Sequence, residues 1–138
     1  MLRWPVAMAL VHGQHVDEAR RILRETPSEH VPTIAGQCSR FMLLAIDQRP
    51  EEAKACFDPD LLSRARNVEW WSWWVSECYA FIDERELAID WLENAFRRGF
   101  FPYPYVSKHS SAFRKLDDEP RFQQLLGKIK TAWEEFEP

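Results

Sequence analysis

The sequence is poor in glycine and has no long apolar run. Only 4 of its 138 residues are glycine, too few for a phosphate-binding loop or for a β fold that depends on tight turns. No stretch approaches the ~18 consecutive apolar residues of a membrane-spanning helix, and the N-terminus lacks the basic and apolar segments of a signal peptide. We therefore expect a cytoplasmic protein with no membrane partner.

Charge and cysteine content exclude further classes. The formal net charge is −4, a sign that argues against a nucleic-acid partner because such surfaces usually carry a basic patch. Cys38, Cys56 and Cys78 are an odd number without Cys-x-x-Cys spacing, which favours reduced, buried thiols over disulfides or zinc ligands. Because neither a dinucleotide nor a P-loop motif is present, we expect no cofactor and no metal.

No group of side chains predicts catalysis. His12 and His15 straddle a predicted helix end, so we interpret them as exposed turn residues. Residues 107–111 place Ser, Lys and His side by side, but adjacent loop residues rarely converge on one reacting atom. Paired carboxylates fall at helix ends or on solvent-facing positions, where capping and solubility explain them. We therefore expect that the protein is not an enzyme.

A repeat of 34 to 35 residues runs through the first two thirds of the chain. Alanine recurs at positions 19, 53 and 88, and each alanine is followed four residues later by a large apolar side chain. A small residue allows two antiparallel helices to approach closely, and the large residue one turn later fills the space beside the contact. A polar turn precedes each alanine: Gly13-Gln14-His15, Asp47-Gln48-Arg49 and Asp83-Glu84-Arg85.

This period and alanine pattern resemble the tetratricopeptide repeat family. The resemblance implies an all-α, right-handed superhelix of about three helical hairpins and a C-terminal capping helix, in a single domain over residues 1–138. The repeats would cover about 1–32, 33–67 and 68–99, followed by an aromatic loop at 100–117 and a capping helix at 118–137. The second repeat departs from the family pattern, because Phe41 occupies the small position and Arg40 an apolar one.

Local signals place the helices within these repeats. Proline and N-capping residues mark starts, and Gly99 is expected as a C-terminal cap. The expected helices cover about 2–12, 16–25, 33–47, 50–57, 60–66, 68–82 and 85–98, with a short turn at 110–116. The last helix carries an apolar stripe that we expect to dock on the third hairpin, with Trp133 buried. The stripe consists of Phe122, Leu125, Leu126, Ile129, Trp133 and Phe136.

The C-terminal part carries a second resemblance. Its motifs are Ala88-Ile-Asp-Trp-Leu-Glu-Asn-Ala95, Arg98-Gly-Phe, Tyr103-Pro-Tyr, Phe113-Arg-Lys-Leu116 and Pro120-Arg-Phe122. They are similar to the closing segment of tetratricopeptide arrays in large bacterial signalling and regulatory proteins, which implies a C-terminal interaction module. Met1 already lies in the first expected helix, so we expect another domain or a second copy of the chain to cover that end.

The run Trp70-Trp71-Ser72-Trp73-Trp74 carries the functional prediction. Four indoles in five helical residues cannot all face one core. Repeat geometry would direct one residue set toward a concave groove suited to a protein or peptide partner. That set is Trp4, Met8, Cys38, Met42, Trp70, Trp73 and Glu77. Two alternatives stay open for this groove and its function: the aromatic segment after residue 99 fills it, or the chain is a self-association (homodimer) module. An α-helical enzyme is a further alternative.

Overall fold

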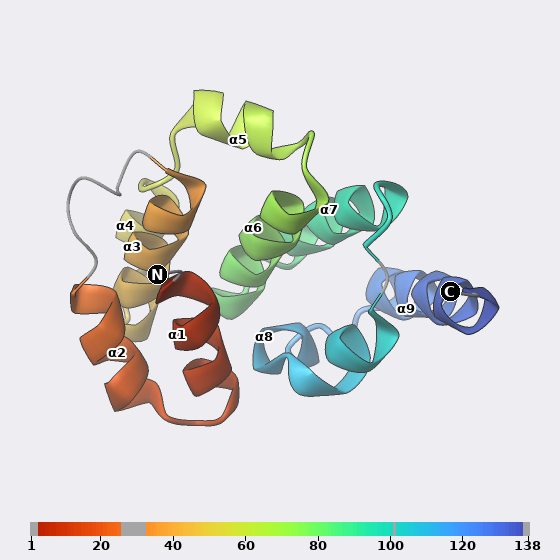
Figure 1. Ribbon diagram of the computed structural model, residues 1–138, viewed down its shortest axis with the longest axis horizontal. Helices are drawn as coiled ribbons and strands as arrows, with labels where there is room; N and C mark the ends of the chain where they lie inside the picture. The colour runs from red at the N-terminus through yellow and green to blue at the C-terminus, as the bar shows by residue number, and fades with distance from the viewer. Residues whose placement is uncertain (1–2, 26–32, 101, 137–138) are drawn as a thin grey trace. The chain divides into compact units, whose positions relative to one another are not determined.

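The computed structural model describes residues 3–25, 33–100 and 102–136, and it contains only helices and connecting turns within those ranges (Figure 1). The all-α class expected from the sequence is therefore confirmed. The α-helices are α1 (Arg3–His12), α2 (Val16–Arg24), α3 (Ile34–Ile46), α4 (Pro50–Lys54), α5 (Pro59–Ala65), α6 (Glu69–Phe81), α7 (Arg85–Arg97), α8 (Ser111–Arg114) and α9 (Pro120–Glu135), and a π-helical turn, η2, covers Tyr105–His109.

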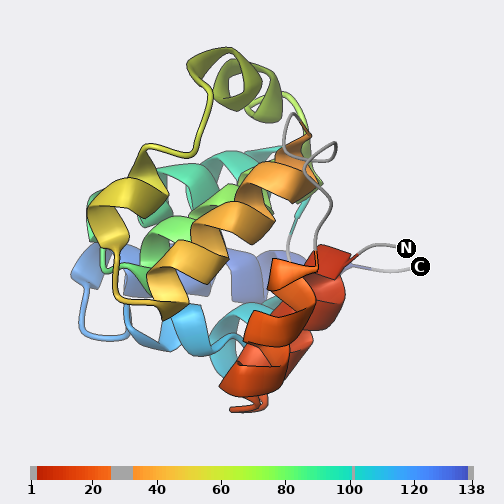
Figure 2. The same ribbon diagram turned by 90° about the vertical axis from the view of Figure 1, so that its left-hand side faces the viewer.

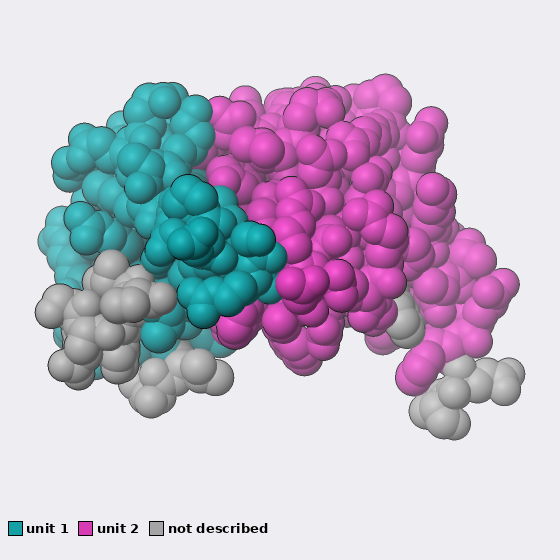
Figure 3. Space-filling model, turned by 90° about the horizontal axis from the view of Figure 1, so that it is seen from above, with its two compact units in different colours: residues 1–65 teal, residues 66–138 magenta. Residues whose placement is uncertain are grey.

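The chain divides into two compact units, residues 1–65 and 66–138 (Figure 3). The first unit holds α1 to α5, and the second holds α6 to α9 with η2. The boundary falls just before the end of the second expected repeat. Each unit is described here by itself.

Three inter-helix turns share one backbone geometry. A residue with positive φ stands at Gln14 (68°), Gln48 (61°) and Asp83 (65°). The amide of the next residue donates to a carbonyl five positions back: His15 to Leu10, Arg49 to Leu44 and Glu84 to Tyr79, at 2.7 to 2.9 Å. This is the bond pattern that satisfies the last carbonyls of a helix through a left-handed residue. The turns recur with the alanine spacing, so the sequence repeat is also a structural repeat.

The repeated alanines lie at the helix contacts that the pattern predicts. Ala19, Ala53 and Ala88 are fully buried, and Leu23, Phe57 and Leu92, four residues later, are buried as well. In the third hairpin, the Ser76 hydroxyl donates to the Ala88 carbonyl at 2.6 Å. A hydroxyl on one helix that reaches the backbone of the next requires a close approach of α6 and α7.

Enlarging the alanine at this contact should destabilise the fold. We expect Ala88→Leu to lower the free energy of unfolding by about 1–3 kcal/mol, because the added atoms have no space between α6 and α7. Urea denaturation measures the effect. Ala55→Leu is the matched control, because Ala55 is exposed and should change stability by less than about 0.5 kcal/mol. Equal stability of the Ala88→Leu variant and the parent protein would contradict a close helix contact at this position.

In unit 1, α1 packs on α2, α2 and α1 pack on α3, and α3 packs on α4 (Figures 1 and 2). Helix α4 ends at Lys54, three residues before the expected end. The Cys56 amide donates to the Ala53 carbonyl at 3.0 Å in a tighter turn, and the Asp58 amide donates to the Gln37 side chain of α3 at 3.0 Å. Phe57 then stacks on Phe41, with ring centroids 4.9 Å apart. The large residue at the atypical position of the second repeat therefore fills the space left by the short helix.

In unit 2, α6 and α7 form the most extensive helix pair. Polar contacts join the two helices at the end opposite the turn that connects them. The Asn94 amide donates to the Arg66 carbonyl and to the Ser72 hydroxyl, both at 2.9 Å. Gly99 ends α7 with a φ of 102°, and the Phe100 amide donates to the Ala95 carbonyl at 3.0 Å. The predicted glycine cap is confirmed, and it directs the chain into the aromatic segment that follows.

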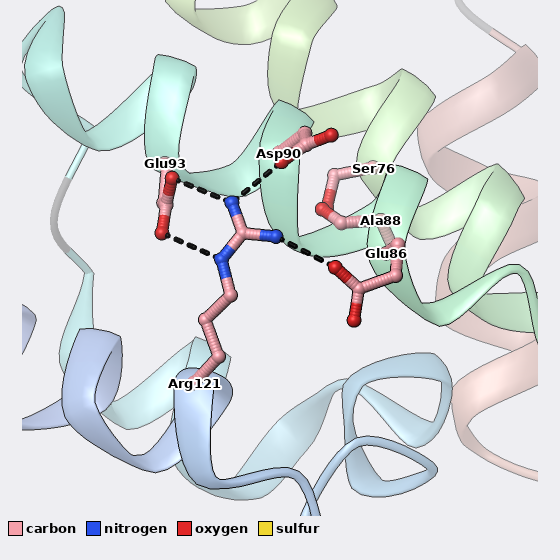
Figure 4. Close-up of polar contacts among 6 residues, drawn as sticks. All are labelled: Ser76, Glu86, Ala88, Asp90, Glu93 and Arg121. Atoms are coloured by element: carbon pink, nitrogen blue, oxygen red, sulfur yellow. Dashed lines mark hydrogen bonds and ion pairs between the residues drawn. The ribbon is translucent and has the colours of Figure 1, made fainter.

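Helix α9 is fixed to α7 by one arginine (Figure 4). The Arg121 guanidinium donates to Glu93 at 2.9 and 3.2 Å, to Asp90 at 2.5 Å and to Glu86 at 3.0 Å. These carboxylates lie on one face of α7, spaced four and three residues apart, as successive turns require. Hydrogen bonding to Glu93 and Asp90 raises the pKa of Arg121 above its ordinary value. The contact sets where α9 begins along α7.

The expected docking of α9 is correct for only part of its apolar stripe. Four stripe residues are buried: Phe122, Leu125, Leu126 and Ile129. Trp133 is 45% exposed and Phe136 58% exposed, so the expectation that Trp133 is buried is wrong. Arg121 begins α9 opposite the middle of α7, and α7 ends at Arg97. The apolar stripe is therefore buried only over the first part of α9, up to Ile129.

Candidate interaction surface

The tryptophan-rich helix α6 distributes its indoles around the helix axis. Trp71, Trp73 and Trp74 are half-buried, whereas Trp70 is 55% exposed. Ser72, within the tryptophan run, and Ser76, one turn later, are fully buried against α7. A five-residue run covers more than one helical turn, so the sequence necessarily directs some indoles away from the α6–α7 contact. Trp70, Trp73 and Glu77 share one face, as the repeat pattern predicts.

Trp73 lies at the centre of an aromatic stack that consists of Trp70, Trp73, Phe100 and Tyr105. Its ring stacks on Phe100, with centroids 4.8 Å apart and planes 21° from parallel. Tyr105 meets Trp73 edge to face at 5.1 Å, and Trp70 lies against Trp73 at 5.7 Å. The stacked geometry with Phe100 and the edge-to-face geometry with Tyr105 are favoured arrangements of aromatic pairs. Phe100 and Tyr105 restrain Trp73, and Trp73 in turn contacts Trp70, so Trp70 is an exposed ring on an aromatic base.

Glu77, one turn further along α6, is buried with 1% of its surface exposed. Its carboxylate accepts hydrogen bonds from the Tyr105 hydroxyl at 2.8 Å and from the Ser110 hydroxyl at 3.2 Å. Burial, and then the adjacent Glu77, raises the pKa of Tyr105 well above its ordinary value, so the phenol stays a donor. These contacts hold the segment after Gly99 against α6.

The segment after Gly99 is helical in part, although the sequence analysis expects a loop with only a short turn. Val106 of η2 is fully buried, and its carbonyl accepts from the Arg114 guanidinium at 2.5 Å. Ser110 caps α8 by accepting from the Phe113 amide at 3.3 Å. The Ser-Lys-His-Ser-Ser run therefore contributes packing and capping contacts.

The other four predicted groove residues belong to unit 1, and all are buried: Trp4, Met8, Cys38 and Met42. Among the seven predicted residues, only Trp70 presents a largely exposed side chain. In unit 2, the structure corresponds to the alternative in which the aromatic segment covers Trp73 and Glu77. Partner binding by the seven residues stays a prediction.

Reactive and metal-binding groups are sparse in the described part of the chain. No three His, Cys, Asp or Glu side chains gather there in a way that could hold a metal ion. Cys38 and Cys78 are buried, and burial raises the pKa of the half-buried Cys56 thiol, which disfavours the reactive thiolate. Among the helices described, none is both long and apolar enough to cross a bilayer.

Two surface features could not be predicted from the sequence. The Arg121 contact joins residues about thirty positions apart, and nothing local in the sequence selects its partners. The exposed end of the α9 stripe has the same spacing as the buried part, so the pattern cannot separate them. No other signal in the sequence separates the two parts.

Comparison with known proteins identifies no relative. No protein-family model, no curated protein and no solved structure matches the chain. Function is therefore inferred from the geometry of this chain alone.

Proposed function

We propose that the chain is a protein–protein interaction module built from tetratricopeptide-like hairpins that stack into a right-handed superhelix closed by α9. The shared turn geometry at Gln14, Gln48 and Asp83 and the buried alanines that follow support the hairpin repeat. Arrays of such hairpins are suited to binding extended or helical segments of other proteins. The proposed context is the C-terminal module of a larger bacterial signalling or regulatory protein, and no catalysis is assigned.

The exposure of Trp70 on its aromatic base is the observation that carries this proposal. A large ring left 55% exposed on a soluble surface loses little conformational entropy on binding when its neighbours already restrain it. Tryptophan is also enriched among the residues that dominate binding energy in interfaces. The proposed partner is a peptide segment with an apolar or aromatic side chain that packs on the outer face of this indole.

Peptides selected from a random 12-residue display library on the immobilised full chain provide the test. We expect Trp70→Ala to weaken binding of a selected peptide by about 30-fold, which corresponds to the ~2 kcal/mol of an interface hot spot. Isothermal titration calorimetry measures the affinity. Leu87→Ala removes another exposed apolar side chain of unit 2 and is the matched control, with affinity unchanged.

Two results would count against the proposal. One is that no peptide is enriched above a blank surface. The other is that the enriched peptides bind the Trp70→Ala variant as tightly as the parent protein. Trp70 makes few buried contacts, so its replacement should leave the folded state intact, and circular dichroism confirms that point for each variant.

A further inference from the structure

The outer half of α9 exposes an apolar surface that unit 2 does not cover. Trp133 follows the buried stripe residue Ile129 by four positions and lies on the same side of α9, and Phe136, three positions further, is the C-cap residue of the helix. Trp133 is 45% exposed and Phe136 58% exposed. The terminal helix of a helical array normally presents a polar outer face, and this one does not.

The charges beside this surface change sign halfway along it. Lys128 and Lys130 precede Thr131 and Ala132, and Glu134 and Glu135 follow them. Lys128 and Glu135 are both exposed and lie seven residues, or two turns, apart on one flank of the stripe. Each helix thus carries a positive group and a negative group on the same flank. The midpoint between these two groups lies between Thr131 and Ala132.

We propose that the outer half of α9 binds the same segment of a second copy of this chain in an antiparallel, two-fold symmetric pair. Antiparallel pairing places Lys128 of each copy opposite Glu135 of the other, and parallel pairing would place like charges together. Trp133 of each copy lies near the two-fold axis, and Phe136 of each copy packs opposite Gly127 of the other, at the ends of the contact. The charge reversal selects a second copy as the occupant, because a helix with this pattern is its own complement.

This surface is separate from Trp70, and neither proposal depends on the other. Two short helical segments bury less area than a stable dimer needs. We therefore expect monomers and dimers in equilibrium, with a dissociation constant of about 10–100 μM. Self-association by this helix would bring together two copies of whatever the chain is joined to.

Sedimentation velocity of the full chain over a concentration series tests the pairing. The parent protein should show a weight-average sedimentation coefficient that rises with concentration. Trp133→Ala and Phe136→Ala should each raise the dimer dissociation constant at least about tenfold. Trp70→Ala, the control for loss of an exposed indole, should leave it unchanged. A parent protein that stays monomeric up to about 1 mM would overturn the proposal.

A charge cycle tests the orientation with variants that leave the apolar surface intact. Lys128→Glu and Glu135→Lys should each weaken the dimer about three- to tenfold, because each places like charges opposite one another. The double variant K128E/E135K should recover most of the parent affinity. Dimerisation that is unaffected by the single reversals, or not recovered in the double variant, contradicts the antiparallel pair. A dimer that survives all of these α9 variants would place self-association elsewhere.

Discussion

Phe122→Ala is expected to lower the free energy of unfolding by about 3–5 kcal/mol, the range for a truncated core aromatic. Phe122 is fully buried in the first turn of α9, and its ring centroid lies 6.4 Å from that of Phe113 in α8. Replacement by alanine removes this contact and leaves a cavity where α8 and α9 meet. Urea denaturation followed by circular dichroism at 222 nm measures the change.

The matched control lies two positions further along α9. Gln124 is exposed, so Gln124→Ala should change stability by less than about 0.5 kcal/mol. The pair separates loss of core packing from a general effect on helix propensity. A loss below about 1 kcal/mol for Phe122→Ala would mean that α9 is an appendage of unit 2 and contributes little to its core.

Trp73→Ala has the second largest expected effect, a loss of about 2–4 kcal/mol. The indole of Trp73 stacks on Phe100 and meets the edge of Tyr105, so its removal leaves the segment after Gly99 without its main aromatic contact on α6. The same denaturation experiment measures the loss. Trp70→Ala, on the same face of α6 but mostly exposed, should cost less than about 1 kcal/mol.

The Trp73→Ala and Trp70→Ala results together decide between the two groove alternatives. A covered groove predicts a large loss at Trp73 and a small loss at Trp70. An open groove predicts small losses at both positions, with both indoles accessible to iodide quenching. Equal, small losses would therefore contradict the aromatic stack.

Much of the fold can be predicted from the sequence because its determinants are local. The alanine period and the polar turns indicate the helix pairs, and Gly99 has no side chain to oppose the positive φ that ends α7. Helix limits agree within three residues, and the largest difference is at α4, which ends at Lys54. Such signals are read from a few neighbouring residues, without knowledge of tertiary contacts.

The functional surface could be predicted only in part because its determinants are not local. Repeat geometry places Trp73 and Glu77 on one face, but the cover comes from Phe100, Tyr105 and Ser110, about 27 to 33 residues away. Sequence spacing does not reveal how that segment folds back. The α9 stripe shows the same limit, because periodicity indicates the apolar side and not how much of it is buried.

A ¹⁵N-indole NMR titration of the full chain with a selected peptide tests the interaction surface most directly. The chain has seven tryptophans, and the Trp70 cross-peak is identified by its absence from the spectrum of the Trp70→Phe variant. The Trp133 cross-peak is identified in the same way. We expect the Trp70 resonance to shift most as peptide is added, while that of Trp133 stays in place. A saturating titration in which other indole resonances move and that of Trp70 does not would contradict Trp70 as the binding site.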